Sequence, residues 1–379
     1  MILFRLFRRG FLRRPGRTTL ALGGTASALA LLMLAGSMSE GVSRAMSGSE
    51  AARTLVVYRK NRYCPQTSFL PEFYQDRIAK VPGVVSTLPV KVFLNNCRAS
   101  LDLVTFQGAP VDRLFASRDI KIVAGDVERF RREKDSALLG RSFAARKGLS
   151  PGDQFRFGAI DVKVAGIFSS GESVEEGIVL THLAYLQRAG PVDRLGTVTQ
   201  FEVKVADAAA APAVARAIDE LFASSDPPVD TRPKVAFLEA AVKDLREILR
   251  FTGALAIVCA AVVLALVANT VAMSAAERVR EFAVLRTLGY GERHVFGLVL
   301  GEAATLGLIG GGVGVLAAVI VVRFTHLTFG AEGVPVAFAA DFGPALRGVL
   351  AAVIAGLLGG IVPAWRSARL SVVQALRER

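Results

Sequence analysis

The residue types that most often carry out chemistry are sparse and scattered in this chain of 379 residues. Its three histidines, His182, His294 and His326, are far apart, and the sequence has no Cys-x-x-Cys or mixed Cys/His cluster. Zinc sites need such ligands at short spacings, so we expect no metal site. The sequence also lacks the phosphate-binding Gly-x-x-x-x-Gly-Lys-Ser/Thr loop, His-Glu-x-x-His and Gly-x-Ser-x-Gly. It therefore indicates no catalytic residues and no nucleotide site of its own.

Two of the three cysteines, Cys64 and Cys97, lie in a long polar region. If that region is outside the cell membrane, in an oxidising compartment, the two could form a disulfide. Two separate buried thiols are the alternative. The third cysteine, Cys259, lies in an apolar stretch, where we expect a small space-filling side chain.

One short segment, residues 277–294, combines charge with a high apolar content. Its charged and apolar side chains alternate at helical spacing, and Gly289 can end a helix. A short amphipathic helix offered to a soluble partner explains the pattern, and an interfacial helix lying on lipid is the alternative. In the first interpretation, charged side chains pair with the partner and apolar ones fill its groove. The residues assigned to this contact are Arg280, Glu281, Phe282, Leu285, Arg286, Leu288 and Gly289.

Glu302 is an acid beside a long apolar stretch. An ionisable residue within a membrane is a functional candidate, and the alternative is that Glu302 lies near the interface or bonds a neighbouring helix. Repeated Gly-x-x-x-Gly pairs nearby indicate helices that pack closely in lipid. The glycines of these pairs are Gly297, Gly301, Gly307, Gly310, Gly311, Gly314, Gly356 and Gly360.

These residues must be positioned by helices that are long enough to cross a bilayer. Four windows without a charged residue cover 18–39, 251–276, 303–322 and 348–365. At a rise of about 1.5 Å per residue, each can cross a hydrocarbon core about 30 Å thick. The chain is 52% hydrophobic and has a mean hydropathy of +0.43. The four windows exclude an ordinary soluble enzyme, and the many Val, Leu, Ile and Phe residues of the polar remainder exclude a disordered chain.

The distribution of charge predicts the orientation of these spans. The first 17 residues hold six arginines and no acid, and the last 14 hold four arginines and one glutamate. Both termini are therefore expected in the cytoplasm. Since the net charge of +13 is concentrated beside the spans, it indicates contact with the lipid bilayer and no nucleic acid. Residues 8–12 also resemble a twin-arginine export signal, but the following apolar run of 22 residues is longer than the ~7–15 of signal cores.

The long polar region between the first two spans is expected to be a mixed α and β domain. Residues 41–53 and 233–250 continue the spans as stalk helices, with a flexible linker as the alternative. Residues 150–153 form a turn, and Pro89 is expected to interrupt a strand, which would then be an edge strand or two pieces. Strands are predicted at 54–57, 84–94, 154–157, 162–168 and 201–205, and helices at 69–80, 137–146 and 208–222.

The expected fold is thus a membrane protein with four transmembrane α-helices and a large extracytoplasmic α+β domain between spans one and two. The predicted segments are a basic amphipathic cytoplasmic segment at 1–17, transmembrane helices at 18–40, 250–276, 295–322 and 345–365, the external domain with its stalk helices at 41–249, the cytoplasmic coupling loop at 277–294, a short external loop at 323–344 and a cytoplasmic tail at 366–379.

Several stretches together resemble the MacB/FtsX-like ABC transporter permeases, the membrane subunits of type VII transporters. Residues 280–290 are similar to that family's coupling segment. Glu302, with the Leu-Gly-Leu-Ile-Gly-Gly run at 306–311, is similar to its third span. The tail at 363–377 and the external stretch at 139–166 also resemble the family, whereas the fused ATPase domain of MacB itself has no counterpart.

The resemblance implies a permease of the inner membrane that forms a homodimer and carries a periplasmic domain with a porter-like lobe and a β-rich inserted lobe. The chain itself binds no cofactor. A separate ABC ATPase subunit would bind ATP and Mg and would dock on residues 277–294. ATP-driven closure would move the spans, and the stalk helices would carry this motion outward, a mode called mechanotransmission.

The expected function is export of a periplasmic or membrane-derived substrate, with a membrane-fusion adaptor and an outer-membrane channel as further partners. Two alternatives remain open at the level of sequence. One is extraction of lipoproteins or lipids, as in Lol-type relatives, and the other is regulation of cell-wall hydrolases in the manner of FtsX.

Overall fold

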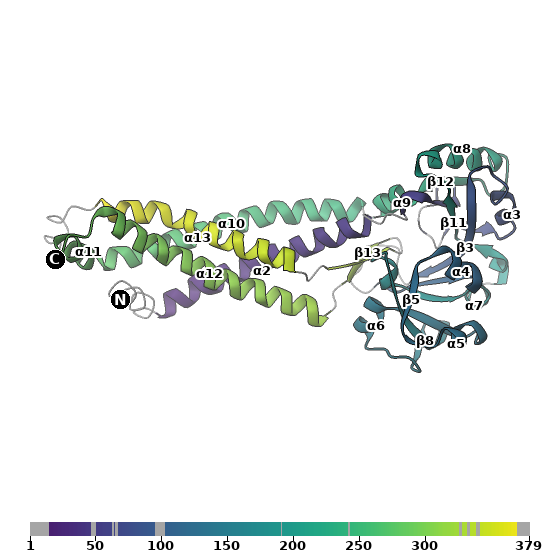
Figure 1. Cartoon of the computed structure of the whole chain (residues 1–379), viewed down its shortest axis with the longest axis horizontal. Helices are drawn as coiled ribbons and strands as arrows, with labels where there is room; N and C mark the ends of the chain where they lie inside the picture. Colours follow the sequence, from purple (N-terminus) through teal and green to yellow (C-terminus); the bar gives the residue numbers. More distant parts are fainter. Residues whose placement is uncertain are drawn as a thin grey trace. The chain divides into compact units, whose positions relative to one another are not determined.

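The chain divides into two compact units (Figure 1). The helical unit comprises Met1–Ser37, Leu249–Phe324 and Ala339–Arg379, and the α/β unit comprises Met38–Ile248 and Thr325–Phe338. The structure, a computed structural model, describes residues 15–46, 51–62, 64, 67–94, 103–190, 192–241, 243–325, 328–331, 334–338 and 342–369.

Within these described ranges, four helices are long and apolar enough to cross a membrane, as the four charge-free windows predict. Their apolar spans are Thr18–Arg44, Arg250–Glu277, Glu292–Thr325 and Ala345–Ala368. The complete helices are α2 (Pro15–Met46), α10 (Lys243–Glu277), α12 (Glu292–Thr325) and α13 (Phe342–Ala368), and the short α11 (Val279–Thr287) connects α10 to α12.

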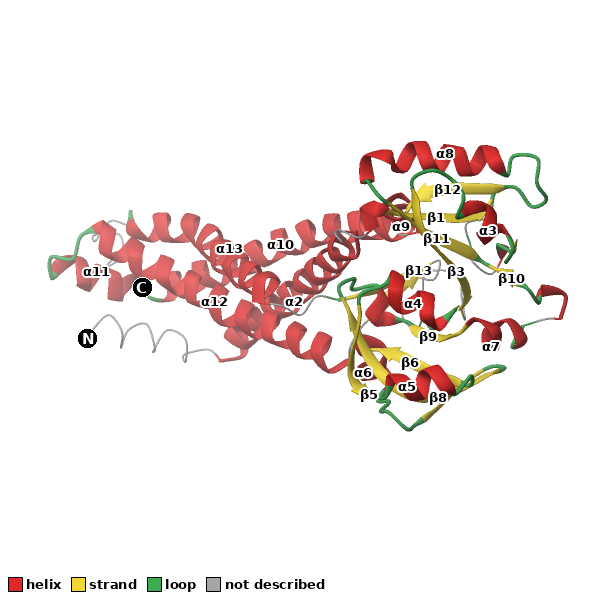
Figure 2. Cartoon of the chain, turned by 45° about the vertical axis from the view of Figure 1, so that its right-hand side comes forward, coloured by secondary structure: helices red, strands yellow, loops and turns green. Residues whose placement is uncertain are grey.

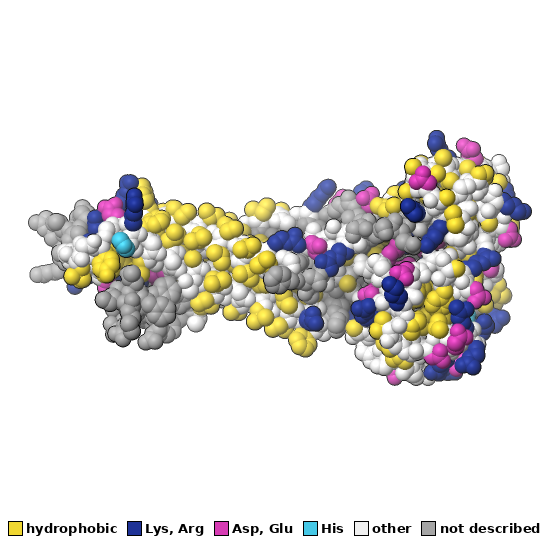
Figure 3. All heavy atoms as spheres, viewed as in Figure 1, with side chains coloured by type: hydrophobic (Ala, Val, Ile, Leu, Met, Phe, Trp, Pro, Cys, Tyr) yellow, Lys and Arg dark blue, Asp and Glu magenta, His cyan; other side chains and the backbone are white. Residues whose placement is uncertain are grey.

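The helical unit exposes large apolar side chains, for example those of Leu20, Phe251 and Ile257. Figure 3 shows hydrophobic side chains along the visible flank of α10, α12 and α13, whereas charged side chains are scattered over the α/β unit. A protein surrounded by water rarely exposes a continuous apolar surface of this extent. The exposed flank therefore agrees with helices that lie in lipid.

The α/β unit is built on one sheet whose order, among the described strands, is β12-β1-β11-β3-β4-β9-β6-β8-β5, with β7 paired to β8. Strand β3 (Val84–Leu94) connects two lobes (Figure 2). It pairs with β11 through residues 84–90 and with β4 through residues 91–94. The predicted interruption at Pro89 is wrong. Pro89 lies opposite Phe201 of β11, before the pairing with β4 begins, so its missing N–H breaks no bond to β4.

The first lobe places helices on one face of β1, β11 and β12. Its core contains the stacked rings of Tyr74 and Phe222, whose centroids are 4.3 Å apart, packed with Phe201 and Ile218. The predicted helix at 69–80 is shorter than expected, because its first residues pair as a strand with β10. The elements are β1 (Thr54–Arg59), β2 (Leu70–Pro71), α3 (Tyr74–Ile78), β10 (Thr197–Val198), β11 (Gln200–Val205), η5 (Ala208–Ala210), α8 (Ala211–Leu221) and β12 (Val229–Pro233).

The second lobe is the β-rich one, and both faces of its sheet are buried. Phe130 and Phe168 belong to the core on one face, and Phe106 and Phe143 to the core on the other. The turn predicted at 150–153 is confirmed by a bond from the Asp153 N–H to the Ser150 carbonyl. The elements are β4 (Thr105–Ala109), α4 (Val111–Ser117), β5 (Ile120–Gly125), α5 (Val127–Arg132), β6 (Ser136–Gly140), α6 (Arg141–Lys147), β7 (Gln154–Phe157), β8 (Ile160–Ser170), η3 (Glu175–Gly177), β9 (Val179–His182), α7 (Leu183–Arg188) and η4 (Val192–Arg194).

The helix predicted at 137–146 is wrong in its first half. Residues Ser136–Gly140 form strand β6, and only α6 from Arg141 onward is helical. All five residues of β6 are buried. A strand buried on both faces shows no alternation, so its apolar run cannot be distinguished from a helix by periodicity.

Three chain segments lead between the two units. Helix α2 runs on to Met46 and is followed, after residues outside the described part, by η1 (Ala51–Arg53). Strand β12 leads into α9 (Lys234–Ala241) and then α10, as the predicted stalk requires. The chain between α12 and α13 forms a hairpin of β13 (Thr328–Ala331) and β14 (Val334–Ala337), which belongs to the α/β unit.

Candidate functional site

Helix α11 is the element on which the predicted partner contact depends. It begins after Arg278 and ends at Leu288, and Gly289 has a φ of +92°. The Gly289 N–H bonds to the Arg286 carbonyl, and the Tyr290 N–H bonds to the Leu285 carbonyl. This pair of bonds around a left-handed residue is the Schellman motif, which glycine favours because it has no Cβ. The predicted role of Gly289 in ending the helix is therefore confirmed.

The inner face of α11 packs on its own chain. The side chains of Phe282 and Leu285 are buried, with 3% and 7% of their surface exposed, in a cluster that includes Val271 of α10 and Val295 and Val299 of α12. Burial inside the helical unit means that Phe282 and Leu285 anchor α11. They are not available to fill a groove of a partner, contrary to our expectation from the sequence.

The outer face of α11 is exposed and partly apolar. Val284 and Leu288 have exposed fractions of 51% and 70%, and Arg280 is also exposed. Arg286 Nη2 lies 2.9 Å from Glu292 Oε1, at the start of α12. Of the assigned contact residues, the structure thus presents Leu288 and Arg280 outward, and Val284 is an exposed apolar residue that the sequence analysis did not assign.

A buried ionic group joins α11 to the two helices beside it. Arg278 Nη1 lies 3.3 Å from Glu302 Oε2 of α12, and Arg278 Nε donates to Glu281 Oε2 at 3.0 Å. Ser274 Oγ of α10 donates to Glu302 Oε1 at 2.6 Å. Glu302 therefore bonds to a neighbouring helix, α10. Such a bond was the expected alternative to a functional role for this residue. The ion pair of Glu302 with Arg278, at the start of α11, also holds in place the segment that is expected to contact a partner.

The glycines of α12 and α13 differ in what they contact. A Cβ added to Gly356 would lie 2.7 Å from the Ala303 carbonyl oxygen, and one added to Gly307 would lie 2.5 Å from that of Ala352. Such distances leave no room for a side chain, so these residues permit close helix packing. Similar contacts occur at Gly310, Gly311, Gly314 and Gly360, whereas Gly297 and Gly301 meet nothing within 4 Å in the described structure.

The cysteine prediction is only partly covered by the structure. Cys64 is disulfide-bonded, and Cys259 is a free thiol in α10. Cys97 lies outside the described residues, so its pairing with Cys64 stays a prediction. Within the described ranges, no three His, Cys, Asp or Glu side chains come together as metal ligands.

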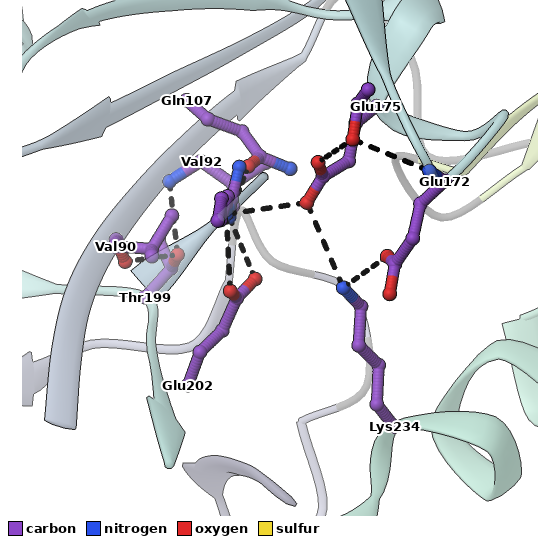
Figure 4. A network of polar contacts seen from close by, with 10 residues as sticks. Val90, Val92, Gln107, Glu172, Glu175, Thr199, Glu202 and Lys234 are labelled. Carbon is purple, nitrogen blue, oxygen red and sulfur yellow. Dashed lines mark hydrogen bonds and ion pairs between the residues drawn. The ribbon is translucent and has the colours of Figure 1, made fainter. Parts of the chain in front are cut away.

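The α/β unit contains a buried group of five charged residues that the sequence analysis missed (Figure 4). We call it the charge network; it consists of Arg118, Glu172, Glu175, Glu202 and Lys234. Arg118 follows α4 in the second lobe, and its Nη2 lies 2.7 Å from Oε1 of Glu202 in β11 of the first lobe. Arg118 Nε also donates to Glu202 Oε2 at 3.2 Å, so the pair makes a two-point contact between the lobes.

The other half of the charge network involves the first residue of α9. Lys234 Nζ lies 2.5 Å from Glu172 Oε2 and 3.8 Å from Glu175 Oε1. Glu175 Oε1 lies 3.3 Å from Arg118 Nε, and Glu175 Oε2 accepts a bond of 2.6 Å from Ser170 Oγ. The network borders a cavity of about 180 Å³. Each charged group of the network has an opposite charge beside it, and the members come from different elements. The network therefore connects these elements through ion pairs.

Opposite charges beside Glu202 and Lys234 shift the pKa values of both residues toward their ionised forms. Burial raises the pKa of Glu202, but the cations Arg118 and Lys234 outweigh that effect and hold this pKa below its ordinary value. Burial lowers the pKa of Lys234, but the three carboxylates outweigh it and raise this pKa above its ordinary value. Glu202 and Lys234 are therefore both charged near neutral pH.

The sequence carries little sign of the charge network. Its members are spread from residue 118 to residue 234, among many other charged residues of the polar region. Only the alternation of Gln200, Glu202 and Lys204 with apolar residues in β11 places Glu202 on a defined face. Which residues it meets depends on the sheet order and on the start of α9.

Two family models match the chain. Residues 253–372 match the FtsX-like permease C-terminal model, and residues 18–221 match the MacB-like periplasmic core domain. Both are permease domains, and no ATPase domain is found in this chain. Along the chain, the MacB-like match comes first and the FtsX-like match second. The FtsX-like match contains most of three of the described long apolar helices.

Individual relatives match over shorter stretches. The chain is 34% identical over 108 residues to the macrolide export ATP-binding/permease protein MacB of Nitrobacter winogradskyi, which covers 28% of this chain and 16% of that protein. It is 32% identical over 148 residues to the pyoverdine export ATP-binding/permease protein PvdT of Pseudomonas entomophila, which covers 39% and 22%. The chain thus spans less than a quarter of the length of these relatives.

A solved structure of the periplasmic region of MacB from Actinobacillus actinomycetemcomitans is similar to 51% of this chain and 92% of its own, with 13% identity and a TM-score of 0.37. The family matches agree with the described structure, which has four long apolar helices and a large mixed α/β domain between the first two. This chain is therefore a multi-pass ABC-type permease of the MacB/FtsX family, with an FtsX-like C-terminal part and a MacB-like extracytoplasmic core domain.

Proposed function

We propose that this chain couples ATP hydrolysis in a separate ATPase subunit, which binds the ATP and Mg, to movement of its extracytoplasmic domain. The observation that carries the proposal is the arrangement of α11. Its inner face and Arg278 bind it to α10 and α12, while its outer face is exposed. A partner that displaced α11 would therefore displace both helices, because buried packing and a buried ion pair resist sliding.

The docking surface in this proposal is the outer face of α11. Val284 and Leu288 supply apolar side chains for a groove of the ATPase, and Arg280 supplies charge. Glu281, Arg286 and Gly289 shape the helix and its two ends. Phe282 and Leu285, which the sequence assigned to the groove, hold the helix in place from behind.

The movement would reach the extracytoplasmic domain along α2 and along α10 with α9. Few polar side chains interrupt the described spans, which favours mechanotransmission over a hydrated path for a substrate. We further propose an inner-membrane homodimer with both termini in the cytoplasm. Since the relatives MacB and PvdT are named for export, we propose export of a periplasmic or membrane-derived substrate with an adaptor and an outer-membrane channel.

The exposed apolar residues of α11 provide the test. In the full chain reconstituted with the ABC ATPase subunit that copurifies with it, Leu288→Asp and Val284→Asp should each weaken ATPase binding about tenfold or more, the scale of an interface hot spot. Permease-stimulated ATP hydrolysis should fall accordingly. The control is Val192→Asp, the same change at an exposed apolar residue of the α/β unit.

Unchanged binding and unchanged stimulated hydrolysis in both α11 variants would show that α11 is not the docking helix. Leu285→Asp would be a poor substitute. Leu285 is buried between α11 and its neighbours, so a charge there would disturb the helical unit itself.

A further inference from the structure

The segment 172–177 of the second lobe contacts two of the three chain connections to the spans, and the third connection contacts one of these two. It comprises Glu172, Glu175 and the short helix η3, and it directly follows strand β8. The segment contacts the start of α9 and the hairpin between α12 and α13, and α2 near its end contacts that hairpin. All of these contacts lie within the α/β unit.

The first connection reaches the segment through Lys234, the first residue of α9. Its Nζ lies 2.5 Å from Glu172 Oε2, and the Lys234 side chain is only 13% exposed. Figure 4 shows Glu172 and Glu175 pointing toward Lys234. A buried ammonium group cannot leave two buried carboxylates without exposing uncompensated charge, so α9 and this segment are expected to move together.

The second connection is the hairpin β13–β14. A Cβ added to Gly177 would lie 2.6 Å from the Pro335 ring, so the hairpin rests directly on the backbone of η3. Val334 and Val336 are buried, and Val334 borders a smaller cavity of about 50 Å³ together with Glu175 and Lys234. The hairpin therefore meets the segment beside the charge network.

Other contacts fix the hairpin from both sides. Arg146 of α6 donates to Thr328 Oγ1 of β13, and its Nη2 donates to the Leu103 carbonyl at 2.9 Å. Near the end of α2, a Cβ on Gly41 would collide with the Ala337 carbonyl of β14. Thus α2 contacts the hairpin, and the hairpin contacts the segment 172–177.

We infer that the β13–β14 hairpin is a transmission element in its own right and that residues 172–177 combine its movement with that of α9. Movement of α12 and α13 then reaches the second lobe through Pro335 and Gly177, while movement of α10 reaches it through Lys234. Glu175 passes the displacement on to Arg118 and, across the lobes, to Glu202. This inference rests on the proposed function, since it concerns how the motion reaches the domain.

The test uses Gly177→Ala, with Gly171→Ala as the matched control. The added methyl group must push against the rigid Pro335 ring in the first variant, whereas its nearest neighbour in the second is 3.9 Å away. In the full chain in lipid nanodiscs without nucleotide, Gly177→Ala should increase amide hydrogen exchange in the hairpin, and Gly171→Ala should not. Equal exchange in the two variants would overturn the inferred contact.

The second arm uses the complex with the copurifying ABC ATPase. In the wild-type and Gly171→Ala complexes, ATP should change hydrogen exchange at residues 172–177 and in the second lobe. Gly177→Ala should abolish that change while ATP hydrolysis continues. A wild-type complex that hydrolyses ATP without any change at residues 172–177, or a Gly177→Ala complex that keeps the change, would overturn the inference. Neither outcome concerns docking on α11, which the Leu288→Asp and Val284→Asp variants test separately.

Discussion

Buried charged residues mark the joints of this protein. Arg278 and Glu302 connect α11 to α12, and Arg118 and Glu202 connect the two lobes of the domain. Replacing such pairs by apolar residues is often neutral for stability, so stability alone is a weak reason for their presence. Breaking one partner leaves an uncompensated buried charge, which costs about 3–5 kcal/mol. Such an ion pair resists small displacements, which supports the proposed transmission of movement.

His182 gives the second lobe a defined response to pH. Its ring is buried, and Nε2–H donates to the Phe130 carbonyl at 2.6 Å. Burial lowers the pKa of His182 below its ordinary value of 6.5, although the bond to Phe130 opposes this shift. As the pH falls below 6.5, the unfolded chain binds the proton first, so the free energy of unfolding should decrease.

This dependence can be measured as the thermal unfolding midpoint of the domain in the full chain between pH 7.5 and 5.5. We expect the midpoint to fall with pH in the wild type and to fall less in His182→Gln. His294 is exposed and lies in the helical unit, so His294→Gln should behave as the wild type. A wild-type slope in His182→Gln would assign the pH dependence to other groups.

At the scale of elements, the helices α12 and α13 approach each other through glycine. Gly307 and Gly356 lie on facing surfaces, and a Cβ on Gly356 would be 3.1 Å from the Gly307 Cα. Because glycine has no side chain, the two backbones can pack closely at these positions. Such close packing matters in a lipid bilayer, where no hydrophobic effect drives helices together. This close packing supports the proposed movement of the helices as a connected group.

Gly356→Ala should destabilise this packing, because its methyl group would meet the Ala303 carbonyl oxygen at 2.7 Å. Overpacking of this kind costs about 1–3 kcal/mol. Gly312→Ala, in α12, meets nothing within 4 Å and should be neutral or stabilising by up to about 1 kcal/mol, the difference in helix propensity. Unfolding of the purified chain in mixed micelles measures both changes. Equal midpoints for the two variants would contradict the inferred close packing.

At the scale of the whole molecule, the orientation that we propose in the membrane rests on the charge at the two ends of the chain. Arginines are concentrated before the first span and after the last one. Arginine is retained on the cytoplasmic side during insertion, so an even number of spans places both ends there. In this proposed orientation, the α/β unit lies outside and α11 lies on the cytoplasmic side.

Labelling of single cysteines checks this orientation. In a Cys259→Ser background, Ser150→Cys in the domain and Gly291→Cys after α11 both lie at exposed positions. A membrane-impermeant maleimide should label Ser150→Cys in spheroplasts and should label Gly291→Cys only after permeabilisation. The reverse pattern would place the domain in the cell interior and contradict the proposed function as a whole.

The membrane part of the fold is the part that the sequence predicts best. The four charge-free windows determine four spans, because crossing a hydrocarbon core about 30 Å thick needs a continuous apolar run of one length. The capping role of Gly289 is likewise a local property of the chain. Which face of α11 is buried is not local. Phe282, Leu285 and Leu288 are similar in the sequence, and only packing on α10 and α12 separates the first two from the third.

The sequence by itself therefore determined the spans, their order, the presence of an α+β domain between the first two and the amphipathic coupling segment. Tertiary structure alone decided the continuity of β3 through Pro89, the strand at Ser136–Gly140, the charge network and the contact of the hairpin with Gly177. Hydrophobic length and periodicity depend on neighbours along the chain. The salt bridge of Arg118 with Glu202, 84 positions apart, and the contact of Gly177 with Pro335 depend on how distant parts of the chain pair and pack, which no local pattern encodes.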